Sequence, residues 1–319
     1  MTIHKVAVIQ LHPKPTNVED NHRRAYNFIC EAASKGAVLA VLPEQVSLNL
    51  QITFIKIFRY HLTGWTPENP SFALCASNYK TYLESYCTLA AELQINIVPG
   101  SIVEAHPSPS CSVSCSSCPA TGSTRPQFVN IAYFISATGK ILGSYQKANL
   151  WSGERAHLSS VRPTNSHHQV ISTPLGTVGL LLCWDLAIPE AFRSLVSQGA
   201  KIIILPALWT GLGSAPAGLK RNPEFEKQML QSLLNARAFE NSVAVVFTNA
   251  GDTENNKNLG QSQVVMPFSG SVETPLGSEE AVKIFDLDMD EIGDAEDYYK
   301  IREDMTANDW RYGRVGTHD

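Results

Sequence analysis

The most informative stretch of the sequence is residues 178–185, VGLLLCWD, which Pro189 and Glu190 follow closely. The apolar run predicts a buried strand, and a proline in this position favours the start of a helix. Cys183 would then leave the sheet at a strand-to-helix turn, where a nucleophile can be exposed on a rigid support. A lone cysteine is more often an inert core residue. Its function therefore depends on whether the chain also supplies a base, a cation and oxyanion donors.

The composition is that of a soluble globular protein, with 319 residues, 44% of them hydrophobic and 17% charged, and a net charge of −5. The sequence has no basic patch interleaved with aromatic residues, so we expect no nucleic-acid partner. Its apolar runs are far shorter than the ~18 residues that span a bilayer, so we expect no membrane association. The absence of a leader pattern and the odd number of seven cysteines favour a reduced, cytoplasmic protein.

Short β-rich segments alternate with amphipathic segments along the whole chain. This alternation predicts a single α/β domain over residues 1–319 with mixed sheets. The predicted strands are residues 5–10, 37–42, 95–100, 128–135, 140–145, 176–183, 201–205, 242–248, 261–266 and 281–285. The predicted helices are residues 17–34, 70–93, 189–198 and 223–239.

Two segments interrupt this alternation and are predicted to be insertions, at about residues 45–59 and 105–125. The second is rich in Ser, Pro and Cys and is typical of an exposed loop. The first, QVSLNLQITFIKIFR, is apolar and β-rich and directly follows Glu44. Two interpretations remain open for it, translated intron sequence or a real hairpin that acts as a lid or an oligomer contact. Sequencing the transcript across this region would decide between them.

No cofactor and no metal site are predicted. Cys111, Cys115 and Cys118 have a spacing known from iron–sulfur enzymes, but they lie mid-chain in the Ser/Pro-rich segment without a supporting motif. No phosphate-binding loop and no Gly-rich dinucleotide motif follows a predicted strand, so a nucleotide cofactor is not expected either.

Four polar residues stand at or near the ends of predicted strands, where α/β proteins place their chemistry. Glu44 follows the apolar run of residues 37–43, and Lys147 follows the strand at 140–145. Glu154 comes seven residues after Lys147, and Cys183 ends the strand described above. Each could singly be a solvated loop residue, but the coincidence of all four indicates an active site.

These residues belong to motifs that resemble those of the nitrilase superfamily, the carbon–nitrogen hydrolases. The motifs are LPE at 42–44, YQK at 145–147 with a downstream glutamate, and CWD at 183–185 followed by PE. Segments at 222–223, 236–241, 260–262 and 309–312 also resemble the family, so the likeness covers the chain except for the two insertions. It implies a four-layer α-β-β-α sandwich that assembles into a homodimer or a higher homo-oligomer.

The resemblance implies a role for each site residue. Cys183 would be the nucleophile that forms a thioester, and Glu44 the general base that takes the thiol proton and later activates water. Lys147 and the backbone N–H of Trp184 would stabilise the oxyanion. Glu154 would be the second glutamate, which orients the lysine or the substrate. A neighbouring ammonium lowers the pKa of a thiol, so we expect the thiolate fraction of Cys183 near pH 7 to be raised.

The resemblance also narrows the substrate to a small molecule. Trp184 after the thiol resembles nitrilases, whereas Asp185 resembles amidases and carbamoylases. Ala187 stands where many amidase-type members have an arginine that contacts a substrate carboxylate. His61 and Arg237 are further candidates for substrate contact or for support of the site. We expect amide hydrolysis, with nitrile hydrolysis as the alternative.

A non-catalytic function is the alternative from a different class. A nitrilase fold that only binds or scaffolds would result if the insertion after Glu44 displaced the base. Retention of all four site residues favours the enzyme.

Overall fold

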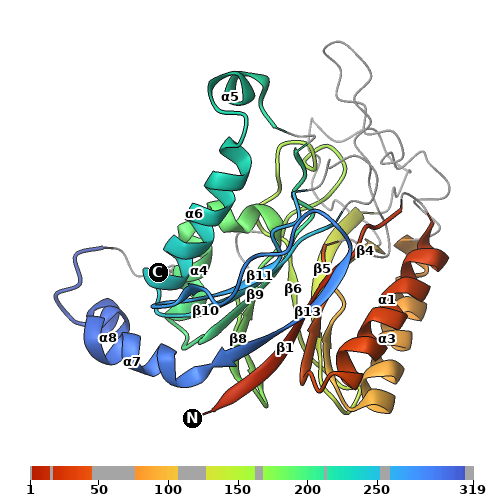
Figure 1. Cartoon of the computed structure of the whole chain (residues 1–319), viewed down its shortest axis with the longest axis horizontal. Coiled ribbons are helices and arrows are strands. Elements are labelled where there is room, and N and C mark those ends of the chain that lie inside the picture. Colours follow the sequence, from red (N-terminus) through yellow and green to blue (C-terminus); the bar gives the residue numbers. More distant parts are fainter. Residues whose placement is uncertain are drawn as a thin grey trace, which may run out of the picture.

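Two β-sheets form the centre of the molecule (Figure 1). The structure is a computed structural model that describes residues 2–14, 17–44, 76–106, 127–161, 168–211, 214–251 and 259–312. The insertion predicted at 45–59 and the candidate His61 lie outside the described residues, as does 107–125 of the second predicted insertion.

The first sheet has the strand order β13-β1-β2-β3-β5-β4, and β6 pairs with β5. Strands β1, β2 and β3 are parallel, whereas the other pairings are antiparallel. The bounds are β1 Ile3–Gln10, β2 Leu39–Val41, β3 Asn96–Val98, β4 Ser101–His106, β5 Gln127–Ile135, β6 Ile141–Gln146 and β13 Ala281–Asp288.

The second sheet has the order β12-β11-β10-β9-β8-β7, with a parallel centre of β8, β9 and β10. Its central strands are continuous apolar runs because both faces are covered. The bounds are β7 Ile171–Thr173, β8 Gly176–Leu180, β9 Ile202–Pro206, β10 Ala244–Thr248, β11 Gln263–Met266 and β12 Gly270–Ser271.

Helices cover the outer face of each sheet (Figure 1). Buried side chains of α1 and α3, such as Ile29 and Tyr86, pack on the first sheet. Side chains of α4 and α6, such as Phe192 and Leu234, pack on the second. The bounds are α1 Val18–Ser34, α3 Tyr79–Leu93, η1 (a 3₁₀-helix) Cys183–Ala187, α4 Pro189–Val196, α5 Pro216–Arg221, α6 Phe225–Phe239, α7 Met289–Tyr299 and α8 Ile301–Thr306.

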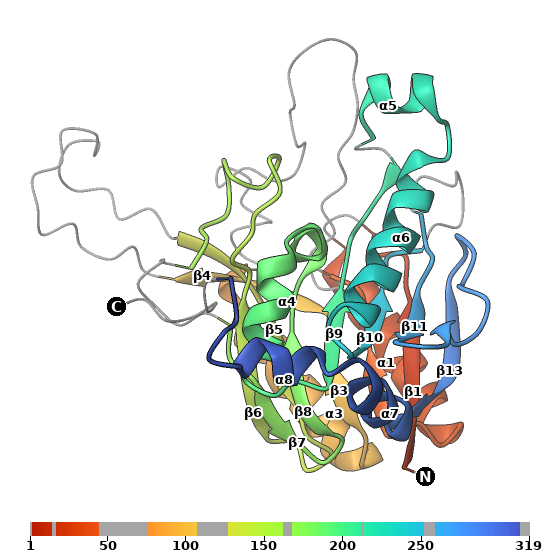
Figure 2. The same ribbon diagram turned by 90° about the vertical axis from the view of Figure 1, so that its left-hand side faces the viewer.

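The predicted four-layer α-β-β-α sandwich is confirmed. Between the sheets, Val6 and Val8 of β1 share one buried apolar cluster with Val178 and Leu180 of β8. The Asn17 side chain caps α1 by accepting from the backbone N–H of Asp20. Helices α7 and α8 follow β13, and α7 begins beside the N-terminus (Figure 2), where the Met289 N–H donates to the Thr2 carbonyl.

Several elements differ from the sequence prediction, which also missed β7, β12, α5 and α8. Strand β8 ends at Leu180 rather than at Cys183, because Cys183 already belongs to the short helix η1. The prediction missed β4, whose last two residues, Ala105 and His106, had been assigned to the second insertion. It also missed α7, which Asp288 caps by accepting from the backbone N–H of Asp290.

Candidate active site

The topology brings the predicted site residues to one end of the two sheets. Glu44 comes three residues after β2, and Lys147 directly follows β6. Strand β6 is antiparallel to β5, which is antiparallel to β3, so β6 runs in the same direction as β2. Their carboxyl ends therefore meet at one edge of the first sheet. Cys183 follows β8 in the second sheet, and its pKa responds to the charges of Glu44, Lys147 and Glu154.

Lys147 links the two glutamates. Its Nζ donates to Glu44 Oε1 at 2.7 Å and to Glu154 Oε1 at 2.7 Å. All three side chains are buried, with residue exposures of 1% for Glu44 and Lys147 and 8% for Glu154. Glu154 Oε2 accepts from the backbone N–H of Trp151 at 2.8 Å, and this bond fixes the Glu154 side chain within the turn that carries it. The contacts also show that Glu44 is not displaced from Lys147.

Two further groups hold Glu44, and sequence reasoning missed both. Asn130 on β5 donates from Nδ2 to Glu44 Oε1 at 2.9 Å. The backbone N–H of Leu208, just after β9, donates to Glu44 Oε2 at 3.0 Å. The role of the Leu208 backbone N–H cannot be read from the sequence, because almost every residue type has this group. The only sequence sign of Asn130 is that it is a polar residue in an apolar strand.

The segment that carries Leu208 is itself held by a buried asparagine. Asn249, after β10, donates from Nδ2 to the carbonyl of Trp209 at 3.0 Å, and its Oδ1 accepts from the Trp209 N–H at 2.7 Å. The backbone N–H of Asn249 in turn donates to the Ser262 hydroxyl. These contacts fix the direction of the Leu208 N–H toward Glu44.

The backbone at Cys183 is unusual for a residue with a side chain. Its φ is +45°, in the left-handed region that L-residues rarely occupy. Such a conformation costs about 1–2 kcal/mol, so the surrounding contacts must stabilise it. The side chain of Asp185, two residues on, accepts from the backbone N–H of Leu182 at 2.8 Å and so closes the turn. Sequence reasoning had used Asp185 only as a marker of subtype.

Neighbouring charges reverse the effect of burial on the pKa of Lys147. Burial alone would lower the pKa of Lys147, but the charges of Glu154 and Glu44 outweigh it and raise the pKa well above its ordinary value. Lys147 is therefore an ammonium. Burial also raises the pKa of Glu154, which Lys147 opposes.

The expected lowering of the thiol pKa is wrong. Burial and then the charge of Glu44 raise the pKa of Cys183 well above the ordinary value, and Lys147 opposes them without compensating. The negative charges of Glu44 and Glu154 act in the same direction as burial, and together these effects exceed that of the single ammonium. The resting thiol of Cys183 is therefore protonated near neutral pH.

The remaining sequence candidates lie around this centre. The half-buried ring of Trp184 lies 5.6 Å from that of Trp209, measured between centroids. Arg237 is buried and donates from Nε to the Leu186 carbonyl at 3.1 Å and from Nη1 to Glu240 at 2.8 Å. These contacts favour support of the nucleophile turn, rather than substrate contact, as the role of Arg237.

Within the described part of the chain, no group of three or more His, Cys, Asp or Glu side chains is arranged to hold a metal ion. In the same residues, no helix is both long and apolar enough to cross a membrane.

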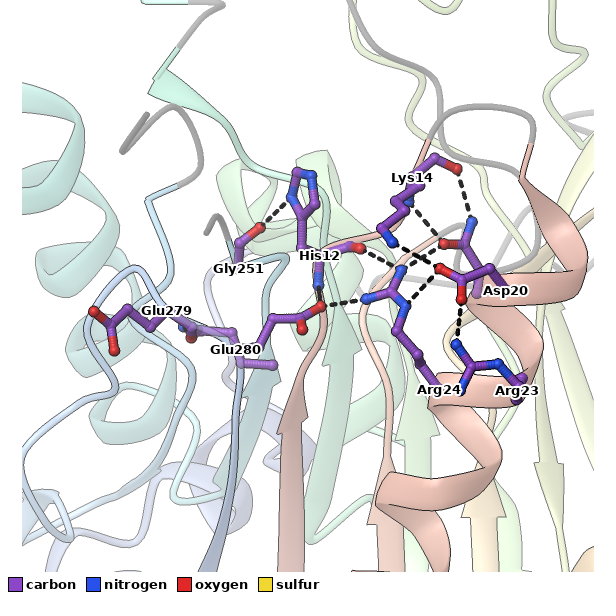
Figure 3. A network of polar contacts seen from close by, with 10 residues as sticks. His12, Lys14, Asp20, Arg23, Arg24, Gly251, Glu279 and Glu280 are labelled. Atoms are coloured by element: carbon purple, nitrogen blue, oxygen red, sulfur yellow. Dashed lines mark hydrogen bonds and ion pairs between the residues drawn. The ribbon is translucent and has the colours of Figure 1, made fainter. Parts of the chain in front are cut away.

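A second polar network lies at the end of β1 (Figure 3). Arg24 of α1 donates from Nη1 to Glu280 Oε1 at 2.5 Å and from Nη2 to the His12 carbonyl at 2.8 Å. The His12 backbone N–H donates to the same Glu280 oxygen, and its Nδ1 donates to the Gly251 carbonyl at 2.9 Å. Because β1 and β2 are parallel neighbours, this network fixes the loop next to the one that carries Glu44.

Arg24→Ala is expected to lower the free energy of unfolding by about 1–3 kcal/mol, because partly buried hydrogen bonds between charged groups are lost. The side chains of Arg24 and Glu280 are 15% and 20% exposed. Arg23→Ala is the control, since that side chain is 65% exposed and should change stability by about 0.5 kcal/mol or less. Chemical denaturation measures both, and equal losses would contradict the role given to Arg24.

The chain was compared with known protein families and with individual proteins. A family model described as carbon-nitrogen hydrolase matches residues 5–297. A probable nitrilase of Schizosaccharomyces pombe is 26% identical over 306 residues, which are 94% of this chain and 94% of the relative. An omega-amidase of Xenopus laevis is 24% identical over 305 residues, or 93% of each chain. A citrullinase of Francisella tularensis is 28% identical over 261 residues, 80% of this chain and 77% of the relative.

Solved structures share the fold. A carbon–nitrogen hydrolase from Helicobacter pylori superimposes with a TM-score of 0.73 at 18% identity and covers 95% of each chain. An amidase of the nitrilase superfamily from Nesterenkonia has a TM-score of 0.65 at 22% identity, covering 91% of this chain and 93% of that chain. At these identities the likeness shows the fold alone.

Proposed function

The chain belongs to the carbon–nitrogen hydrolase family and is therefore an enzyme, and on this premise we propose that it hydrolyses a small amide through a thioester on Cys183. The observation that carries the proposal is the buried ion-pair chain Glu44–Lys147–Glu154 whose charges act on the Cys183 thiol. It supplies a base, a cation and a nucleophile in one place, which is the set that thiol catalysis needs.

In the first half-reaction Glu44 takes the thiol proton while Sγ of Cys183 attacks the carbonyl carbon of the amide. Lys147 has three N–H groups, two of which donate to carboxylates, so the third is left for the developing oxyanion. The backbone N–H of Trp184, in the first turn of η1, is the second donor. When the tetrahedral intermediate collapses, the C–N bond breaks and Glu44 returns its proton to the leaving nitrogen, which departs as ammonia or an amine.

In the second half-reaction water replaces the nitrogen. Glu44, now a carboxylate again, takes a proton from a water molecule as that water attacks the thioester carbonyl. The C–S bond breaks, the thiolate of Cys183 recovers the proton from Glu44, and the carboxylic acid leaves. Preorganised oxyanion donors of this kind contribute about 3–4 kcal/mol each, and a positioned base about 10²–10⁴-fold in rate.

The protonated thiol gives Glu44 a defined task. Because burial keeps Cys183 neutral at rest, the nucleophile exists only when the base accepts its proton. Glu44 is oriented for this by Asn130 and by the Leu208 N–H, and the latter also acts on the pKa of the thiol. The backbone amide of Leu208 therefore acts on both the base and the nucleophile.

Amide hydrolysis is preferred over nitrile hydrolysis because several relatives are named as amidases, including the omega-amidase of Xenopus laevis. A variant of the Nesterenkonia amidase with glutamine in place of a glutamate carries the acetamide moiety of fluoroacetamide covalently added at the active-site cysteine. Nitrile hydrolysis remains the second candidate, since Trp184 follows the thiol and the Schizosaccharomyces pombe relative is named a probable nitrilase. Assembly into a homodimer or a larger homo-oligomer and a cytoplasmic location stay predictions.

The test is a panel of small amides, nitriles and carbamoyl compounds with ammonia release as the readout, joined to intact-mass detection of an acyl adduct. We expect release from amides, and an adduct whose peptide maps to Cys183. Release from nitriles alone would select the second candidate. An adduct-free protein that releases nothing across the panel would overturn the proposed function.

A further inference from the structure

Asp185 is a buried carboxylate that the proposed mechanism does not use. It has no solvent exposure. Its Oδ2 accepts from the Tyr145 hydroxyl at 2.8 Å and from the Leu182 backbone N–H at 2.8 Å. Its Oδ1 accepts from Asn149 twice, from Nδ2 at 2.8 Å and from the backbone N–H at 3.3 Å. Four donors thus converge on one carboxylate.

These donors come from the two segments that carry the reacting groups. Leu182 directly precedes Cys183 in the turn after β8. Tyr145 and Asn149 lie two residues before and two residues after Lys147. The Tyr145 hydroxyl also accepts from the backbone N–H of Ala148 at 3.1 Å, so the lysine segment is tied down on both sides.

The two segments belong to different sheets. Lys147 follows β6 of the first sheet, whereas Cys183 follows β8 of the second. Apolar packing between sheets is non-directional, so by itself it does not set their relative position to the accuracy that catalysis needs, which is about 0.5 Å. Directional hydrogen bonds across the gap do. A carboxylate that only capped η1 would need the Leu182 N–H and neither Tyr145 nor Asn149.

We propose that Asp185 is a positioning residue that locks the segment of Lys147 to the turn of Cys183 across the two sheets. The carboxylate holds the left-handed backbone of the nucleophile and the ammonium that serves the oxyanion in one geometry. The inference rests on the proposed function for its effect on turnover, but the lock itself exists whether or not an amide is the substrate.

The charges agree with this role. Burial raises the pKa of Asp185, and the hydrogen bonds from Leu182 and Asn149 oppose the rise. Burial and the charge of Asp185 raise the pKa of Tyr145 well above its ordinary value, so its hydroxyl stays a donor. A buried carboxylate is costly unless its donors are all in place, which makes the arrangement intolerant of small shifts.

The experiment compares Asp185→Asn and Tyr145→Phe with Asp288→Asn, which removes the carboxylate that caps α7 far from the site. Asparagine cannot accept from all four donors, whereas Tyr145→Phe removes one of the four bonds to Asp185, together with the bond from Ala148, and keeps the ring in the core. We expect kcat per titrated Cys183 to fall about 10²-fold in Asp185→Asn and less in Tyr145→Phe, with KM little changed. Asp288→Asn should keep the wild-type kcat.

A second readout does not depend on turnover. The rate of Cys183 alkylation by iodoacetamide is followed against pH, with circular dichroism as the check on folding. In Asp185→Asn and Tyr145→Phe the midpoint of this profile should move toward the ordinary thiol value, because the buried geometry that raises it is loosened. A wild type without amide turnover would refute the proposed function. The alkylation profile would still test whether Asp185 locks the two segments together. Unchanged profiles and unchanged kcat in both folded variants would overturn the inference.

Discussion

Cys183→Ala is expected to lose ammonia release by about 10⁴-fold or more while remaining folded, because the thioester cannot form without the sulfur. Alanine has the same Cβ, so the left-handed backbone at this position is strained no more than in the wild type. The hydrogen bond from Leu182 to Asp185 does not involve the thiol and keeps the turn closed. Initial rates on the best amide of the panel, with thermal unfolding beside them, measure the effect.

The chain offers matched controls for this variant. Among the described residues, Cys30 of α1 and Cys87 of α3 are also free and half-buried, and both pack near the outer face of the first sheet. Cys30→Ala and Cys87→Ala should keep wild-type turnover. If Cys183→Ala turned over as fast as these two variants, the thiol mechanism would be wrong.

Glu44→Gln is expected to lower kcat at neutral pH by about 10²–10⁴-fold, which is the usual contribution of a positioned base. Glutamine has nearly the shape of glutamate but cannot take the thiol proton. It also cannot accept from Lys147, Asn130 and the Leu208 N–H together, so some loss of stability accompanies the loss of rate. Denaturation curves separate the two effects.

The pH dependence of this variant carries the more specific prediction. The pKa of the thiol is raised, so the thiolate fraction at neutral pH is small and grows tenfold per pH unit below that pKa. Without the base, residual turnover should follow this fraction and rise with pH. Removing the charge of Glu44 lowers the thiol pKa, so the rate should begin to rise at a lower pH than that at which the wild-type thiol ionises. A residual rate that stays flat from pH 6 to pH 9 would contradict the role given to Glu44.

Glu104→Gln is the matched control for the base. Glu104 on β4 is another buried glutamate, bonded to the hydroxyl of Tyr133 and to His106. It lies outside the contacts of Lys147 and Cys183. Its neutral variant should keep the turnover and the pH profile of the wild type, so an equal loss in both variants would indicate general damage to the first sheet.

Much of the candidate site was predictable because chemistry-bearing residues sat at the ends of apolar strands. Glu44, Lys147 and Glu154 were identified this way, and the structure joins all three by hydrogen bonds. The groups that orient them were not predictable. Leu208 contributes only its backbone N–H, and Asn130 acts from a strand that the sequence pattern does not pair with Glu44.

The sequence by itself determined the alternation of strands and helices and the residue types available for reaction, because local periodicity and motif order are properties of neighbours along the chain. Only the tertiary structure decided the protonation of Cys183. The sequence placed a lysine near it and predicted a lower pKa, but burial and the charge of Glu44 reverse the sign. The lock at Asp185 was likewise decided in space, since its donors come from two sheets. Electrostatic fields and hydrogen bonds depend on distance and on exclusion of water, and both are set only when the sheets pack.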